Sequence, residues 1–250
     1  MEEFLRRNFG LISNDTQKKI KKTKILLIGC GLGSQIAISA ARKGFKNFIL
    51  CDGDKVELSN LNRQAFDIKD VGVNKAKAIK KKILTINPHC KVEVYPKFVK
   101  HQKEVEMLIK KSDIVVNMAD PNEVIYIINA EARKQNKYVL FPFTFGFGGF
   151  ALVFSPQSAT IEDIVGGKVY GDECFAMLIM NSIKRMPDPF KNKLNFVKTY
   201  QQIIKDNGFV PQLGVSASIT SSIIVGAIIK LIEGVPIPLT PDSILIDPWG

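Results

Sequence analysis

Cysteine is scarce in this chain, and its spacing excludes several classes of protein. The four cysteines, Cys30, Cys51, Cys90 and Cys174, lie far apart and include no C-x-x-C pair. Such a set cannot supply the paired thiolates of a structural zinc site or the dense disulfide framework of a small secreted protein. We therefore expect no zinc and a reducing, cytoplasmic environment.

Targeting and membrane-spanning segments are also missing by sequence criteria. Residues 1–7 begin with two acids after the methionine and lack the apolar core of a secretory signal. The most apolar late stretch, residues 216–232, is interrupted by serines and ends around Lys230, so we expect it to be too polar and too short for a membrane span. The prediction is a cytoplasmic protein with no membrane partner.

Acidic residues are outnumbered by basic ones. The chain has 35 Lys and Arg against 24 Asp and Glu, a net charge of +11, which favours an anionic partner such as a nucleotide. Most lysines lie in short runs, such as residues 80–82, with no aromatic residues among them. That pattern is typical of solvated helix faces. We therefore expect no nucleic-acid partner.

Apolar strand patterns alternate with helical patterns over the first 140 residues. The continuous apolar runs at residues 25–28 and 114–118 are typical of strands covered on both faces, as in a parallel sheet. The alternation predicts right-handed βαβ crossovers and a Rossmann-like, doubly wound α/β sheet with helices on both faces. The other predicted strands are at 48–51, 92–95 and 138–140, and the predicted helices are at 35–42, 74–84, 103–110 and 122–134.

The pattern changes after residue 140. Residues 141–154 hold six phenylalanines and three glycines, which predicts a strand, a tight turn and a return strand in a late antiparallel extension. Packing of these rings is a better interpretation than an aromatic ligand pocket. Residues 171–208 are helical in pattern and basic, and we expect them to cross over the site. From Pro211 a long helix runs to Glu233, where the next residue is a glycine that can end it.

No repeat or low-complexity linker divides the chain. We therefore predict a single domain over residues 1–250, with a nucleotide-binding half at 1–140 and a substrate-side and dimer half at 141–250.

A glycine-rich loop follows the first predicted strand. Gly29, Gly31 and Gly33 alternate with two other residues, and a strand, glycine turn and helix present free N–H groups to a bound anion. Asp52 closes the second strand about twenty residues later, where its carboxylate can accept hydrogen bonds from ribose hydroxyls. The loop is one residue short of the dinucleotide fingerprint. An NAD(P)-binding oxidoreductase therefore remains an alternative.

Polar and basic residues follow Asp52. Two amides and a guanidinium occur within residues 59–63, and Lys75 opens the next predicted helix. The planar fork of Arg63 suits phosphate oxygens, and with the mobile charge of Lys75 it can neutralise a polyphosphate as its bond breaks. A dehydrogenase only holds its pyrophosphate and has no use for such a pair. The alternative is a surface turn in which Arg63 pairs with Glu57.

The sequence from Arg7 to Asp120 resembles the ThiF/MoeB/HesA adenylyltransferases, which share their fold with the ubiquitin-activating enzymes. Together with a later match it covers more than half of the chain, and residues 59–64 are its most specific part. The matching segments are residues 7–12, 29–33, 51–54, 56–64, 71–75 and 86–88, with 211–214 and 229–234 matching the family's late helix.

The resemblance implies a homodimer that uses ATP and Mg²⁺ to adenylate a substrate carboxylate. It places Asp120 at the acidic position linked to magnesium and the reacting phosphates, although an Asp before a proline is otherwise typical of a helix cap. Arg7 matches an arginine that family homodimers insert into the partner's site. The predicted catalytic residues are Arg7, Arg63, Lys75 and Asp120. The predicted nucleotide contacts are Gly29, Gly31, Gly33, Asp52, Asp54, Ser59, Asn60, Asn62, Arg63 and Lys75.

Departures from the family leave the substrate open. The glycine loop is one residue shorter than in bacterial sulfur-carrier activators, and the paired zinc cysteines are absent. Cys174, in a predicted loop, is the best candidate for a thioester nucleophile, but two adjacent acids should raise the pKa of its thiol.

The resemblance allows two kinds of carboxylate. One is a small-molecule cofactor precursor, such as the guanylylpyridinol carboxylate of a methanogen branch of the family. The other is the C-terminal glycine of a ubiquitin-like sulfur carrier. A non-catalytic nucleotide-binding partner subunit is a further alternative, although such subunits usually lose the phosphate-binding residues.

Overall fold

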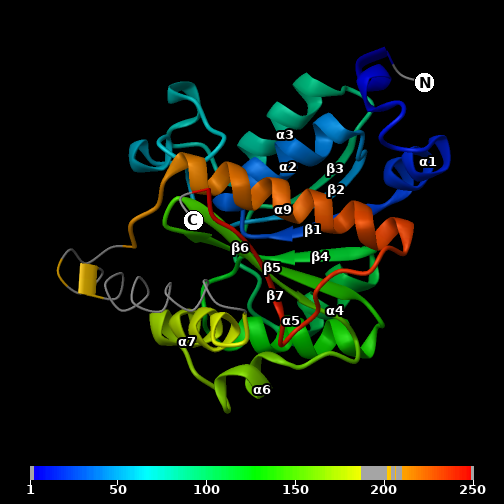
Figure 1. Cartoon of the computed structure of the whole chain (residues 1–250). Coiled ribbons are helices and arrows are strands. Elements are labelled where there is room, and N and C mark those ends of the chain that lie inside the picture. The colour runs from blue at the N-terminus through cyan, green and yellow to red at the C-terminus, as the bar shows by residue number, and fades with distance from the viewer. Residues whose placement is uncertain (1–2, 187–201, 204–205, 207–209, 249–250) are drawn as a thin grey trace.

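The computed structural model describes residues 3–186, 202–203, 206 and 210–248 (Figure 1). Its strands are β1 (Lys24–Ile28), β2 (Asn47–Cys51), β3 (Lys91–Tyr95), β4 (Ile114–Asn117), β5 (Tyr138–Phe145), β6 (Gly148–Phe154) and β7 (Ser243–Ile246). Its α-helices are α1 (Asn14–Lys22), α2 (Leu32–Lys43), α3 (Lys75–Ile86), α4 (Gln102–Lys110), α5 (Glu123–Lys134), α6 (Ile161–Val165), α7 (Gly171–Ile183) and α9 (Gly214–Glu233). The 3-10 helices are η1 (Glu3–Asn8), η2 (Leu58–Asn60) and η3 (Ile68–Asp70).

The described strands form one seven-stranded sheet in the order β3-β2-β1-β4-β5-β6-β7. The pairs among β1 to β5 are parallel, whereas β5–β6 and β6–β7 are antiparallel. This confirms the predicted Rossmann-like sheet with a late antiparallel extension. β5 is longer than the predicted strand and crosses residue 140, so the predicted division into two halves falls inside a strand.

The chain forms these elements for local reasons that the sequence largely shows. β1 and β2 are buried along nearly their whole length, as their continuous apolar runs predict. α2 ends at Gly44, whose φ of +98° lies in the left-handed region, and α3 begins after Asn74, whose side chain accepts a hydrogen bond from Lys77 N. Three short elements, α1, α6 and β7, were not predicted, because α1 carries a single apolar residue and α6 and β7 are only five and four residues long.

Two apolar cores lie on opposite faces of the sheet. Alternate residues of β1 point to opposite sides, so that Leu27 joins one core with α2, α3 and α9, and Leu26 joins the other with α4, α5, α6 and α7. Figure 1 shows the first group of helices on one side of the sheet and the second group on the other. Both faces are therefore covered, as in other doubly wound sheets.

Helix α9 is long and apolar enough to cross a membrane by length and composition. The expectation that this stretch is too polar and too short was therefore wrong on that criterion. Half of its most apolar window is buried inside the structure, and α9 packs against β5, β6 and α2 (Figure 1). Its burial against the sheet explains its apolar composition.

Buried hydroxyl groups fix α9 to the β5–β6 hairpin. Ser216 Oγ accepts a hydrogen bond from Phe145 N at 3.1 Å and donates to Gly148 O. Thr220 Oγ1 donates to Phe143 O at 2.9 Å. A Cβ at Gly149 would lie 2.7 Å from Thr220 N, so this close approach requires glycine. Two of the polar residues that interrupt the apolar stretch, Ser216 and Thr220, are thus its contact points with the sheet.

We predict that Ser216→Ala destabilises the fold, because it removes the buried hydroxyl that links Phe145 N–H to Gly148 C=O. The expected loss in the free energy of unfolding is about 2 kcal/mol, measured by urea denaturation. Ser218→Ala makes the same chemical change on the exposed side of α9 and should cost less than about 0.5 kcal/mol. Equal losses for the two variants would contradict the assigned role of Ser216.

Candidate active site

A cavity of about 1300 Å³ opens where β1, β2, β4 and β5 end, and Ile28, Cys51, Asn117 and Phe141 form part of its wall. The strand order reverses between β1 and β4, and a crevice at such a switch point is where doubly wound sheets bind ligands. The carboxyl ends of the parallel strands bring together residues far apart in sequence. Six of the predicted site residues line the cavity: Gly29, Gly31, Asp52, Asp54, Lys75 and Asp120.

The three glycines of the loop have different roles. Gly29 has a φ of +97°, and a Cβ there would lie 2.6 Å from Met118 O, so the position requires glycine. Gly31 lines the cavity beside Gln64. Gly33 is buried in the first turn of α2, where a Cβ would meet the end of the Met118 side chain. Gly33 does not line the cavity among the described residues, and its predicted contact with the nucleotide stays a prediction.

Asp52 is held at the end of β2 by two backbone N–H groups. Its side chain accepts hydrogen bonds from Cys30 N at 2.6 Å and from Asp54 N at 2.8 Å, and the residue is only 7% exposed. Burial raises the pKa of Asp52, and these two hydrogen bonds oppose that rise. Each carboxylate oxygen has a further lone pair, so Asp52 can also accept hydrogen bonds from hydroxyl groups of a ligand.

Lys75 is the first residue of α3, and its side chain reaches the cavity. Its Nζ lies 3.0 Å from Asp54 Oδ2, and its backbone N donates to Asp54 O at 2.9 Å. Asn74 Nδ2 donates to the carbonyl oxygens of Asp52 and Asp54, which fixes the loop before the helix. The lysine side chain is only 11% exposed. A bound anion can therefore displace Asp54 as its partner without a rearrangement of the backbone.

Arg63 is positioned by a residue much later in the chain. Its Nε donates to Gln212 Oε1, and its Nη1 donates to Ser59 O at 2.9 Å and Asn62 Oδ1 at 2.8 Å. Gln212, which lies 149 residues away in sequence, also lines the cavity. The guanidinium is therefore held by a tertiary contact beside the cavity. The sequence analysis missed Gln212, although it lies in a segment that matches the family.

The other polar residues of this turn maintain its shape. Asn60 is buried, and its Oδ1 accepts a hydrogen bond from Glu57 N at 3.0 Å in the capping box of η2. Ser59 Oγ donates to Glu57 Oε2, and Asn62 Nδ2 donates to Gln212 O. In the described part of the chain these three residues lie beside Arg63 and do not line the cavity. Their predicted contacts with the nucleotide stay predictions.

Asp120 lies on the loop after β4 and is exposed to the cavity. The helix-cap alternative does not hold, because the N-cap of α5 is Asn122, which accepts a hydrogen bond from Val124 N. The loop is fixed from α7 by Gly171 N, which donates to Pro121 O at 2.7 Å. Within the described residues no three His, Cys, Asp or Glu cluster as metal ligands. A Mg²⁺ held by one carboxylate, phosphate oxygens and waters needs no such cluster.

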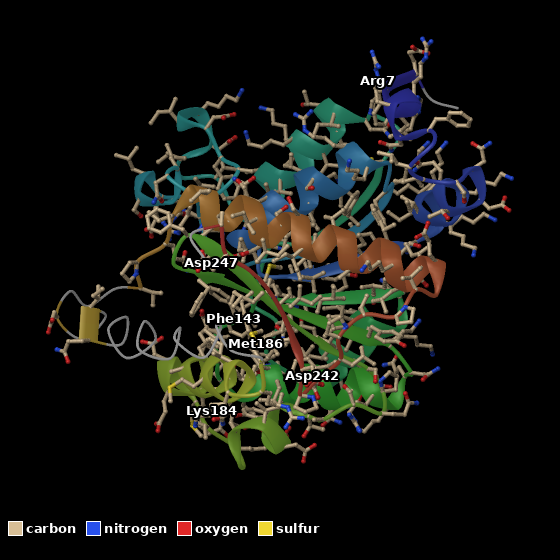
Figure 2. All side chains as sticks on the ribbon, viewed as in Figure 1. Arg7, Phe143, Lys184, Met186, Asp242 and Asp247 are labelled. Carbon is tan, nitrogen blue, oxygen red and sulfur yellow. The ribbon has the colours of Figure 1, made fainter. Side chains whose placement is uncertain are left out.

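Arg7 lies far from this cavity within one chain. It is an exposed residue of η1 and borders a separate hollow with Glu3, Arg6 and Phe9. Figure 2 shows Arg7 near the N-terminal end of the chain, well apart from Phe143. The structure therefore does not bring Arg7 together with the other predicted catalytic residues, and its insertion into a partner's site stays a prediction.

Helix α7 forms the substrate-side wall of the cavity. Asp172 and Glu173 in its first turn and Phe175 beyond them line the cavity. The expectation that Cys174 lies in a loop was wrong: it is fully buried in this helix, 3.7 Å from the Tyr126 hydroxyl. Burial raises the pKa of its thiol and the hydrogen bond with Tyr126 opposes that rise, whereas the adjacent acids of the prediction make no contribution, so Cys174 is a poor nucleophile. Residues 187–201, 204–205 and 207–208 of the predicted crossover lie outside the described residues.

Several cavity residues had no signal that sequence reasoning could use. Lys97, Phe98 and Lys100 come from the loop after β3, Gln64 is the last residue of the matching segment 59–64, and Asn117 lies inside the predicted strand 114–118. Loop residues follow no period, and only the folded sheet shows which of them reach the cavity. The phenylalanines of β5 were expected to pack, yet Phe141 and Phe143 both pack and line the cavity.

Comparison with known proteins identifies one family. A model described as "ThiF family" matches residues 5–249 of this chain. A probable molybdopterin-synthase adenylyltransferase of Gracilaria tenuistipitata var. liui is 36% identical over 152 residues, which are 60% of this chain and 42% of the relative. A sulfur carrier protein adenylyltransferase of Thermus thermophilus is 29% identical over 57% of this chain and 53% of that protein. The chain spans about half the length of these curated relatives.

Solved structures with the same fold align over most of the chain. A crystal structure of PaaA has a TM-score of 0.67 at 23% identity and covers 93% of this chain and 63% of that one. A crystal structure of E. coli MccB with ATP has a TM-score of 0.66 at 20% identity, over 90% of this chain and 60% of that one. At such identities the likeness concerns the fold alone.

We predict that Gly29→Ala and Gly33→Ala differ sharply in their cost. Alanine at Gly29 adds left-handed strain of about 1–2 kcal/mol and a clash with a backbone carbonyl, so the free energy of unfolding should fall by more than about 2 kcal/mol. Alanine at Gly33 meets only the flexible end of Met118 and gains helix propensity, so its cost should stay below about 1 kcal/mol. Urea denaturation measures both, and equal costs would contradict the assigned loop geometry.

Proposed function

The chain belongs to the ThiF family, and we propose that it is an ATP-dependent adenylyltransferase that activates a substrate carboxylate as an acyl-adenylate and releases pyrophosphate. The observation that carries the proposal is one cavity that joins the glycine loop and Asp52 with Lys75 and Asp120. The first two suit the sugar and phosphates of a nucleotide, and the last two suit a phosphate group under attack. Relatives named as adenylyltransferases support this activity.

The proposed reaction needs positioning and charge neutralisation. One carboxylate oxygen attacks the α-phosphorus, the bond from that phosphorus to pyrophosphate breaks, and pyrophosphate leaves with the electron pair. Since the attacking group is already ionised, no general base is required. Asp52 and Gly31 hold the adenosine part, while Lys75 exchanges Asp54 for a phosphate oxygen and neutralises the charge that develops on the leaving group.

Arg63 places a further positive group beside this wall. Its hydrogen bonds with Gln212 and Ser59 hold the guanidinium before any ligand binds, so little side-chain freedom is lost on binding. Preorganised charge of this kind stabilises a transition state without rearrangement during the reaction. Gln212, which contacts both Arg63 and the cavity, is a positioning residue in this proposal.

Asp120 is the residue that would hold Mg²⁺ in this proposal. Magnesium usually binds one or two carboxylates together with substrate phosphates and water, which suits an exposed carboxylate on the cavity wall. When bound, the ion would neutralise charge on the phosphates. The protein's part is to hold the Asp120 loop in place through Gly171 and Asn117.

The substrate is a carboxylate from one of two sources. Relatives named for molybdopterin synthase and for a sulfur carrier protein support a protein C-terminus. The buried Cys174 favours direct transfer of the acyl group from the adenylate to an acceptor, as a small acid would also allow. We further propose a cytoplasmic homodimer with Arg7 in the partner's site, which requires neither zinc nor a nucleic-acid or membrane partner.

Nucleotide selectivity separates this proposal from an NAD(P)-dependent oxidoreductase. We predict that ATP with Mg²⁺ raises the melting temperature of the protein, because a ligand at a hundred times its Kd stabilises the folded state by about 2.7 kcal/mol. NAD⁺ and NADP⁺ at the same concentration should raise it less, since neither carries a Mg²⁺-bound triphosphate that can contact both Lys75 and Asp120. A larger shift with NAD⁺ or NADP⁺ than with ATP would overturn the proposal.

We also predict that Lys75→Met lowers ATP–pyrophosphate exchange by about 100-fold, because the charge opposite the leaving group is lost. Lys77→Met is the matched control: it removes the same charge from the exposed side of the same helix and should change the exchange rate less than about twofold. Exchange is measured with each candidate carboxylate in turn. A variant at Lys75 that retains full exchange with any of them would exclude the assigned role.

A further inference from the structure

Asn117 carries a buried amide group in which, among the described residues, the oxygen has a hydrogen-bond partner and the nitrogen has none. It ends β4, is 1% exposed and borders the cavity. Its Oδ1 accepts a hydrogen bond from Ala119 N at 3.1 Å, but its Nδ2 has no partner among the described residues. Buried donors without partners are rare because they lose their hydrogen bonds with water, so this one requires an explanation.

The orientation of this amide is determined by its surroundings. Ala119 N–H is a donor, so the atom that faces it must be the oxygen of Asn117 and not its nitrogen. The NH₂ group is therefore directed away from the Asp120 loop. Rotation of the amide by half a turn would pair two donors and cannot satisfy the nitrogen.

The wall of the cavity on this side of the sheet is aromatic. Asn117 follows Val115 at the two-residue period of a strand, and Val115 belongs to the core that α7 covers. Phe141, Phe143 and Phe175 line the cavity on this side, with ring centroids 5.0 to 5.9 Å apart and edges against faces. The Asn117 amide thus lies on the same side of the sheet as three cavity-lining aromatic rings that favour apolar groups.

We infer that this aromatic half of the cavity binds the body of an apolar monocarboxylic acid, and that Asn117 Nδ2 donates a hydrogen bond to one oxygen of its carboxylate. The inference rests on the proposed adenylation. The other oxygen then forms the new bond to the α-phosphorus, while the bond to pyrophosphate breaks and pyrophosphate takes the electron pair. Asn117 neither gains nor loses a proton and is a positioning and specificity-determining residue.

Charge at the rim supports a monocarboxylate. Asp172 and Glu173 are exposed in the first turn of α7 and line the same cavity. They would repel a second carboxylate on the substrate, because like charges at short range are unfavourable. An apolar acid meets no such repulsion, since its single carboxylate is directed inward to Asn117 and the nucleotide.

Direct binding of probe acids tests the inference without catalysis. We use 3-phenylpropanoate as the probe, with acetate, succinate and 3-phenylpropan-1-ol for comparison, and measure each Kd by ligand-observed NMR with the full chain and a non-hydrolysable ATP analogue. We expect 3-phenylpropanoate to bind at least about tenfold more tightly than the other three, which lack either the apolar body, the single charge or the carboxylate. Equal affinities would overturn the inference.

Asn117→Asp isolates the donor, because a carboxylate still accepts the hydrogen bond from Ala119 N but cannot donate to the probe. At pH 8 we expect the Kd of 3-phenylpropanoate to rise about tenfold or more. Burial and the probe's own charge raise the pKa of the new Asp, so it gains a proton as the pH falls. Affinity should then recover at pH 5.5, whereas a merely structural defect would not. An unchanged Kd at pH 8 would overturn the role of Asn117.

Asn129→Asp is the matched control. Asn129 lies on α5, is 2% exposed and also has an Nδ2 without a partner in the described part of the chain, but it does not line the cavity. It should leave the Kd of the probe unchanged. Should either Asn variant fail to fold, Phe175→Ala tests the same pocket, because Phe175 is a half-buried residue of α7 that lines the cavity. This substitution should raise the Kd of 3-phenylpropanoate about fivefold and leave the Kd of acetate nearly unchanged. An equal effect on both would overturn the inference.

The two proposals fail separately in these experiments. If no carboxylate supports ATP–pyrophosphate exchange but the Kd of the probe rises in the Asn117 variant, the proposed adenylation fails and the acid-binding pocket stands. If exchange occurs but the Kd of the probe is unchanged in the Asn117 and Phe175 variants, the pocket assignment fails and adenylation stands.

Discussion

The hydrogen bonds of the buried Asp52 carboxylate hold together the two segments on which the site depends. One oxygen binds Cys30 N in the glycine loop after β1, and the other binds Asp54 N in the loop that leads to α3. Because Lys75 is anchored to Asp54, Asp52 determines where the phosphate-binding charge lies relative to the glycine loop. Burial of the carboxylate is unfavourable by itself, and the two N–H groups offset it.

The late helix α9 completes this wall from the other end of the chain. Ser216 and Thr220 fix it on the β5–β6 hairpin, and the residues just before it reach the turn that carries Arg63. A Cβ at Gly214 would lie 2.6 Å from Asn62 O, which shows how closely the two segments approach. The position of Arg63 therefore depends on the packing of a helix that begins about 150 residues later.

Charge and apolar surface divide the cavity into two halves. Lys75 and the glycine loop lie on the side of β1 and β2, whereas Phe141, Phe143 and Phe175 lie on the side of β5 and α7. Asn117 stands between them at the end of β4, next to the point where the strand order reverses. Such a division suits a reaction between a charged nucleotide and a less polar acid, since each half stabilises one reactant.

The sequence by itself determined the parallel strands, the helices between them and the residues of the glycine loop, because buried runs, caps and glycines act over a few positions. It also showed Asp52, Lys75 and Asp120 as candidates. Only the tertiary structure decided that Cys174 is buried in α7, that Gly33 is buried in the first turn of α2, and that Gln212 and Asn117 reach the site. These outcomes depend on which distant segments meet at the sheet's carboxyl edge, and long-range contacts leave no local pattern in a sequence.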